Sequence, residues 1–344
     1  MRLAHLTTAL SVWLVAIAGL PPANAAGLAH EQAALETTLD AVMQAVTAGD
    51  EQALLQRLRE AAVDPQLSAL ERDLLLMGMI SDLRGMPPGS IGPDTFTYLN
   101  DYPPQATMPH EESPLVPVPV HNIRAAASGL RNAWQRVEST YAGALLLTMD
   151  PAALVQAYGL HDEWPVRQGL LMALDSASHG QLEMISFLAL QHIGQTPELA
   201  QLAGEAALRL GDARALEQLL RTGRGSTITS ILRQAPGRLE PDQIGRLLDT
   251  AIAEAPPDIA AVAIAELSPA LLGQTDHADR LFSLLDHEQL GATAALTLAS
   301  NPSDATIVRL GEITRKAGHS SLSANRARLA LELMRMGTDG GIQP

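Results

Sequence analysis

The chain has 344 residues, a formal net charge of −15 and no cysteine. The absence of cysteine excludes disulfides and thiolate metal sites. The negative charge disfavours binding to nucleic acid or to an anionic membrane, because like charges repel each other. We therefore expect a protein that is stabilised by its hydrophobic core alone and that binds no nucleic acid.

Residues 1–25 have the pattern of a secretory signal peptide. Arg2 supplies the positive charge, an apolar run follows from Ala9 to Leu20, and Ala23-Asn24-Ala25 has the small residues of a cleavage site. The run is shorter than the roughly 20 apolar residues that span a bilayer. We expect cleavage after Ala25, a periplasmic location, and no stable membrane insertion of the mature chain.

Residues 26–84 are expected to form N-terminal helical hairpins. Apolar residues recur at helical spacing in three consecutive segments, and Gly49 and Gly85 end the first and the third. The pair Asp64-Pro65 is expected to open the third helix, because proline is favoured in a first helical turn.

Residues 85–120 interrupt this pattern with nine prolines and no helical periodicity. Proline lacks a backbone donor and clashes inside a helix. We expect an extended loop that packs on the helices, and we expect LVPVPV (115–120) to be polyproline-like or an edge segment. The fixed backbone angle of proline lowers the cost of ordering such a loop.

Helices are expected to return over residues 121–159. The most regular apolar stripe in the chain predicts one long buried helix face. This stripe consists of Ile123, Ala126, Ala127, Leu130, Trp134, Val137, Tyr141 and Leu145.

Residues 160–337 repeat one theme, in which a helix rich in alanine and leucine is followed by a polar turn and a second helix. The closing leucines of the first helices are 22 to 36 residues apart, and the 22-residue interval indicates a truncated unit or a wrong alignment. These leucines are Leu174, Leu210, Leu232, Leu267, Leu298 and Leu333.

One of these units, GEAALRLGDARALEQLLRTG (204–223), resembles a HEAT-like repeat, and HDEWPVRQGLLMAL resembles the start of a HEAT helix. The resemblance to HEAT-like and armadillo-type repeat proteins covers about residues 160–337 and implies a fold, not an activity. It implies an all-α, right-handed α-solenoid of stacked helical hairpins, interrupted by the proline-rich loop. Tetratricopeptide-like pairing and a non-repeating helical bundle are the competing folds, and residues 338–344 are expected to form a flexible tail.

Catalytic signatures are absent from the sequence, so we expect no enzyme and no cofactor. A metal site is a weaker alternative, in which imidazoles and carboxylates of the proline-rich loop surround zinc. Its ligands would be His110, Glu111, Glu112 and His121.

Aromatic residues gather between residues 96 and 164. They are interpreted mainly as packing for the loop, while some of them line a groove for a partner, since aromatic and arginine side chains are enriched at binding hot spots. The candidate binding residues are Tyr98, Tyr102, Trp134, Trp164 and Arg167.

These patterns together predict an exported, non-catalytic binding or scaffolding protein whose helical-repeat surface takes a protein or peptide partner. Function inferred from a fold rests on analogy. The alternatives are a cell-wall-associated enzyme or enzyme accessory, and the metal-dependent site at His110–His121.

Overall fold

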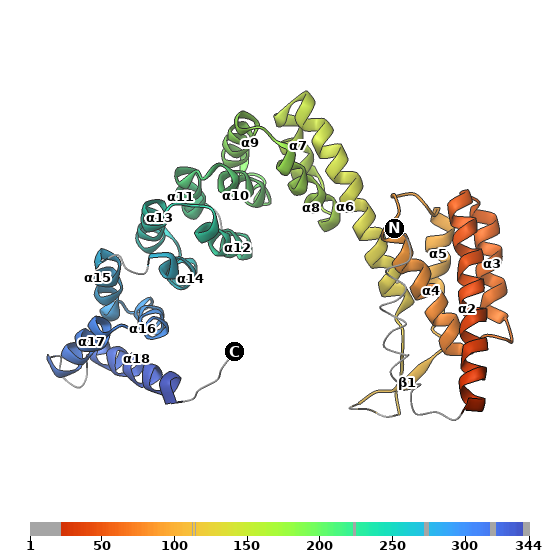
Figure 1. The fold of residues 1–344 in the computed structure, drawn as a ribbon. Helices are drawn as coiled ribbons and strands as arrows, with labels where there is room; N and C mark the ends of the chain where they lie inside the picture. The colour runs from red at the N-terminus through yellow and green to blue at the C-terminus, as the bar shows by residue number, and fades with distance from the viewer. Residues whose placement is uncertain are drawn as a thin grey trace. The chain divides into compact units, whose positions relative to one another are not determined.

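A computed structural model of the chain describes residues 22–111, 113, 115–222, 225–271, 275–316 and 321–339. Within these ranges the fold is all-α apart from one hairpin of two short β-strands (Figure 1). The chain divides into two compact units, Met1–Glu138 and Ser139–Pro344. The expected signal peptide up to residue 21, and residues 340–344 of the expected tail, lie outside the described residues.

Unit 1 packs its helices around one hydrophobic core, in which Val42, Met79 and Leu99 are fully buried. The first helix begins at Pro22, upstream of the expected cleavage site, and the second covers residues 51–63. The elements are α2 (Pro22–Ala48), α3 (Glu51–Val63), α4 (Ala69–Leu83), α5 (Pro93–Asp101), β1 (Thr107–Pro109), β2 (Pro117–Pro119) and the first part of α6 (Ile123–Met149).

The start of α4 differs from the sequence prediction. Asp64 ends α3 instead of opening α4, and the N-cap of α4 is Ser68. Ser68 and Glu71 form a capping box, in which each side chain bonds the backbone N–H of the other residue. This reciprocal cap satisfies two N–H groups that the helix would otherwise leave unpaired. The helix therefore begins after Ser68 and not after the Asp64-Pro65 pair.

The expected loop over residues 85–120 is wrong in part, because it contains α5. Pro93 occupies the first turn of this helix, where a missing N–H costs nothing. Glu51, from the start of α3, accepts hydrogen bonds from the backbone N and the hydroxyl of Thr95 at 3.0 and 3.1 Å. A carboxylate from a distant part of the chain therefore caps α5, and a Cβ at Gly92 would lie 2.0 Å from that carboxylate.

The apolar stripe of α6 is buried in its first half only. Ile123, Leu130 and Trp134 lie in the core of unit 1. Tyr141 and Leu145, in contrast, are exposed by 74% and 62%, which corrects the expectation of one continuous buried face. In the second half the buried residues are Gly143 and Leu147, which lie off this stripe.

Unit 2 is built from helices that follow one another with short connections. The elements after α6 are α7 (Pro151–Leu160), α8 (Trp164–Ala173), α9 (His179–His192), α10 (Leu199–Leu210), α11 (Ala213–Thr222), α12 (Ser226–Gln234), α13 (Pro241–Glu254), α14 (Pro257–Leu267), α15 (Thr275–Ser283), α16 (Gly291–Ser300), α17 (Asp304–Lys316) and α18 (Leu322–Asp339). Short 3₁₀ turns follow α8, α12, α14 and α15 at Leu174–Ser176, Ala235–Gly237, Ser268–Leu271 and Leu284–Asp286.

Helices of unit 2 pack on their neighbours in an alternating order. The contacts α10–α12, α12–α14, α14–α16 and α16–α18 link one row, and α9–α11 and α11–α13 link the other (Figure 1). The six alanine- and leucine-rich segments predicted from the sequence fall on α8, α10, α12, α14, α16 and α18, one in every second helix. The 22-residue interval contains the ten-residue α11 and connections of only two and three residues on either side of it.

Ion pairs connect residues that are 30 to 34 positions apart in unit 2. Their side chains are partly or largely exposed, so solvent screens these ion pairs and each contributes little to stability. The regular interval shows that the same kind of contact recurs from one helix pair to the next. The pairs are Arg209–Asp175, Arg221–Glu254, Arg233–Glu266, Arg280–Asp249 and Arg309–Asp279.

Candidate functional site

The segment after α5 is anchored on α4 by one buried carboxylate. Asp73 is fully buried and accepts a hydrogen bond from the hydroxyl of Tyr102 at 3.1 Å. It also accepts from the backbone N–H groups of Gln105 at 3.2 Å and of Ala106 at 2.9 Å. Hydrogen bonds to a charged acceptor are the strong ones, so this carboxylate fixes the backbone where the hairpin begins.

A second set of hydrogen bonds reinforces this anchor. Arg72 donates to the side-chain oxygen of Gln105 at 2.8 Å and to the carbonyl of Asp64 at 2.6 Å. The side-chain nitrogen of Gln105 in turn donates to the carbonyl of Ala62 at 3.3 Å. The anchor therefore ties the proline-rich segment to α4 and to the last turn of α3.

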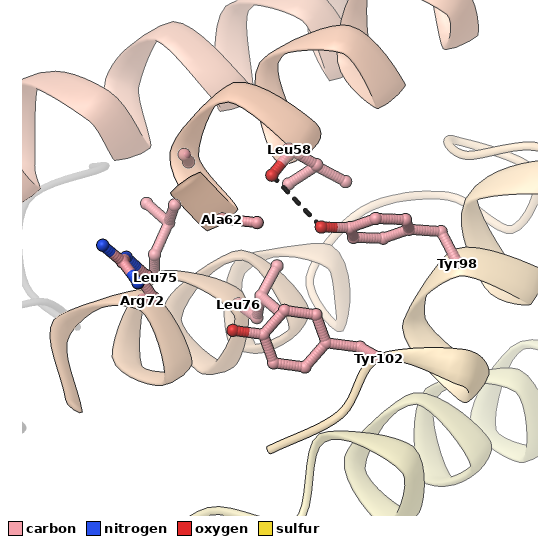
Figure 2. A pocket seen from close by; sticks show the side chains of 8 residues that line it. Leu58, Ala62, Arg72, Leu75, Leu76, Tyr98 and Tyr102 are labelled. Carbon is pink, nitrogen blue, oxygen red and sulfur yellow. Dashed lines mark hydrogen bonds between the residues drawn. The ribbon is translucent and has the colours of Figure 1, made fainter. Parts of the chain in front are cut away.

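Both candidate tyrosines of this region take part in packing. Figure 2 shows Tyr98 and Tyr102 directed toward side chains of α3 and α4, and the hydroxyl of Tyr98 donates to the carbonyl of Leu58 at 3.1 Å. Tyr102 is 6% exposed. Burial, and then the charge of Asp73, raises the pKa of Tyr102, so its hydroxyl stays protonated as a donor. The positions of the two rings favour a role in packing over a role in lining a groove for a partner.

Beyond the anchor the chain forms an antiparallel hairpin in which Met108 pairs with Val118. The N–H of Val120 donates to the carbonyl of Ala106 at 2.9 Å, and the N–H of His110 donates to that of Val116 at 3.1 Å. Hydrogen-bonded and non-hydrogen-bonded pairs alternate in such a ladder. The pairs on either side of Met108–Val118 are therefore non-hydrogen-bonded, and their backbone groups point outward.

The prolines of the hairpin occupy these outward positions. The two non-hydrogen-bonded pairs are Thr107–Pro119 and Pro109–Pro117. Only Thr107 of these four residues has an N–H, so the prolines remove no hydrogen bond from the ladder. They instead leave both edges of the hairpin almost without donors.

One face of the hairpin is apolar and largely exposed. Opposite residues of a pair project to the same side and alternate along each strand. Met108 and Val118 therefore share a face with Val116 and Val120, with Ala106 at one end and with His110 at the turn. Met108, Val116 and Val120 are exposed by 48%, 54% and 40%. Leu115 at the turn is 98% exposed. We call Met108, Val116, Val118 and Val120 the hairpin face.

The zinc site that the sequence offered as an alternative has no cluster of ligands among the residues that the structure describes. No group of three or more histidine, aspartate or glutamate side chains in these ranges is arranged to hold a metal ion. His110 and Glu111 lie at the exposed turn of the hairpin and His121 follows β2. Glu112 lies outside the described residues.

Trp134 is a core residue of unit 1. It is 6% exposed and meets the ring of Phe96 edge-on, with the ring centres 5.6 Å apart. Its indole N–H is buried without a hydrogen-bond partner in the described part of the chain. The aromatic pair joins α5 to α6, as expected for a packing role.

The other two candidate residues belong to unit 2, so the five do not form one site within either unit. Trp164 begins α8 and is 59% exposed. Arg167 donates to the carbonyl of His161 and to Asp162 at 3.4 Å, and its guanidinium lies 5.8 Å from the ring centre of Tyr158. Arg167 thus fastens the turn between α7 and α8.

Comparisons with known proteins do not add a family. The chain has no significant match to a protein-family model, to a curated protein or to a solved structure. Among the described residues, no helix has the length and the apolar character needed to cross a membrane.

Sequence reasoning identified the segment but missed its anchor. Asp73 and Gln105 were not singled out, because Asp73 follows Glu71 and Arg72 directly before the apolar run of α4. The available signal was its helical spacing of three and seven residues from the buried Leu76 and Ile80. The ladder positions of the prolines required the strand register, which the sequence does not specify for a segment exposed on both sides.

Proposed function

We propose that the chain is an exported, non-catalytic binding protein and that the hairpin of unit 1 is its docking element for a protein partner. The observation that carries this proposal is the combination of a fully buried carboxylate anchor with an exposed apolar face immediately beyond it. Exposed apolar side chains that are held in one place favour association, because their ordering cost is already met before binding.

Unit 2 has the role of a scaffold in this proposal. Its alternating helix rows, and contacts that recur every 30 to 34 residues, support a right-handed, HEAT-like α-solenoid, which is a fold that often presents surfaces to other proteins. This part of the proposal rests on fold analogy.

The periplasm is the proposed location. The pattern of residues 1–25 and the lack of cysteine support export with cleavage after Ala25. Cleavage there leaves residues 26–48 of α2, so the mature chain keeps the part of α2 that packs in the core of unit 1. Intact-mass measurement of the exported protein tests this, and a mature chain that retains Met1 contradicts it.

Photo-crosslinking in living cells tests the docking element. A photoreactive amino acid at Leu115, on the turn of the hairpin, is expected to give one discrete adduct with another protein. The matched control is the same amino acid at Val63, which is 75% exposed at the end of α3. Adducts of equal yield at both positions, or none at Leu115, contradict the proposal.

A further inference from the structure

The hairpin offers a partner its face and not its edges. Strand addition requires that an edge both donate and accept hydrogen bonds along the partner strand. Three of the four outward positions are prolines, namely Pro109, Pro117 and Pro119. The edges of the hairpin can therefore accept hydrogen bonds through their carbonyl groups but can donate very few. A partner that binds the hairpin must therefore contact the side chains of the hairpin face.

The charge around the hairpin face indicates which kind of partner surface would complement it. Between Thr107 and Val120, the stretch that contains the hairpin, the sequence has two acidic residues, Glu111 and Glu112, and no lysine or arginine. Glu111 lies exposed at the turn, beside the hairpin face. An apolar surface with acidic surroundings is complemented by an apolar surface with cationic surroundings. A second copy of this chain would bring an equally acidic hairpin and a net charge of −15, so it is disfavoured by repulsion.

We propose that the hairpin face of Met108, Val116, Val118 and Val120 docks face-on against an apolar patch that is flanked by arginine or lysine on a partner protein. This inference rests on the proposed docking function and adds the mode of contact and the partner chemistry. The Asp73 anchor contributes by fixing Gln105 and Ala106 directly before the face, so that little order is gained at binding.

Two synthetic peptides test the chemistry without a known partner. Both contain the same leucines and valines, and their only charged residues are arginines in one peptide and glutamates in the other. Binding to the mature chain is measured by fluorescence anisotropy. We expect the arginine peptide to bind at least about tenfold more tightly than the glutamate peptide, a difference of about 1.4 kcal/mol.

Variants separate the hairpin face from a general attraction to an acidic protein. The double variant Met108→Ser, Val118→Ser keeps the net charge and is expected to weaken binding of the arginine peptide by about tenfold. The matched control is Leu145→Ser, Met149→Ser, which removes two exposed apolar side chains from α6 in unit 2. This control is expected to bind as the unchanged chain does.

Two outcomes overturn the inference. Equal binding of both peptides contradicts the cationic partner, and binding that is insensitive to Met108→Ser, Val118→Ser contradicts the hairpin face. If either occurs while crosslinking at Leu115 still gives a discrete adduct, the docking function stands, and only the partner chemistry (first outcome) or the mode of contact (second outcome) fails. Circular dichroism and thermal unfolding establish that each variant is folded before its binding is compared.

Discussion

Gln181 and Gln243 make the same two hydrogen bonds in two different helices of unit 2. Each side-chain oxygen accepts from the backbone N–H at the start of its own helix, at 2.8 and 2.9 Å. Each side-chain nitrogen donates to a carbonyl of an earlier helix pair, namely Leu147 at 2.6 Å and Gly211 at 2.9 Å. One amide side chain therefore caps its own helix and also joins it to the preceding pair.

Gln243→Glu isolates the second of these bonds. Glutamate retains the oxygen that caps α13 but cannot donate to the carbonyl of Gly211, so we expect a loss of about 1 kcal/mol of unfolding free energy. Urea unfolding measures this loss. The matched control is Gln218→Glu, which makes the same charge change at an exposed position of α11. Equal effects of the two changes would show that the link between helix pairs contributes nothing.

Tyr102→Phe removes one donor from the Asp73 anchor. Because the acceptor is a buried carboxylate, we expect a cost of about 1.5–3 kcal/mol, together with faster protease cleavage between residues 107 and 120. Tyr98→Phe is the control, since it removes a bond to a neutral carbonyl and is expected to cost about 1 kcal/mol. The role assigned to Asp73 is contradicted if the hairpin of Tyr102→Phe resists protease as well as that of the unchanged chain.

Trp134→Ala and Trp164→Ala are expected to differ strongly. Trp134 is buried against Phe96, so its truncation leaves a cavity and costs about 3–5 kcal/mol. Trp164 is 59% exposed, and its truncation is expected to change stability by about 0.5 kcal/mol. Thermal unfolding of both variants checks the order, and a reversed order would place Trp134 outside the core.

Loss of the hairpin prolines is expected to cause self-association. Pro117→Thr with Pro119→Thr restores two outward N–H groups on β2, which lets a second chain pair along this edge. Because two acidic copies of the chain repel each other, sedimentation velocity is measured at high ionic strength, where this variant should show more concentration-dependent dimer than the unchanged chain. Pro103→Thr with Pro104→Thr is the control, because these prolines precede the hairpin. A monomeric double variant at β2 would contradict the blocked-edge interpretation.

Acid is expected to weaken unit 2 through His277. This side chain is 2% exposed, and neither ring nitrogen has a hydrogen-bond partner in the described residues. Burial, and then the nearby charge of Arg280, lowers the pKa of His277 below that of an unfolded histidine, which is about 6.5. Above that pH His277 is neutral in both the folded and the unfolded state, so it does not reduce the stability of unit 2. Below it the unfolded state takes up the proton more readily, so stability falls with pH.

His277→Leu is therefore expected to reduce the fall in thermal midpoint between about pH 7.5 and pH 5, because the titrating group is gone. His179→Leu is the control, since His179 lies exposed at the start of α9. Carboxylates titrate in the unchanged chain and in both variants. The quantity compared is therefore the slope of the thermal midpoint against pH in each protein. An unchanged slope in His277→Leu would assign the acid sensitivity to other groups.

Helices with their own periodicity were predictable, whereas contacts between distant residues were not. The spacing of leucines located α3 and the alternate helices from α8 to α18, because each of these carries its own buried face. The nine-residue α5 was missed because its cap, Glu51, comes from another helix. Pro93-Asp94 was the one local signal for it, and the surrounding prolines obscured it. The hairpin itself was not predicted, since LVPVPV (115–120) was expected to be polyproline-like or an edge segment, and the roles of its prolines depend on the register with β1.

Tryptophan occurs once in each unit of the chain after the expected removal of residues 1–25, which takes Trp13 with it. Trp134 is enclosed in unit 1 and Trp164 is mostly hydrated in unit 2. An enclosed indole emits at shorter wavelength than a hydrated one, so the two emission bands report on the two units without any label. The denaturant concentrations at which the two bands change then tell whether the units unfold as one cooperative system or one after the other.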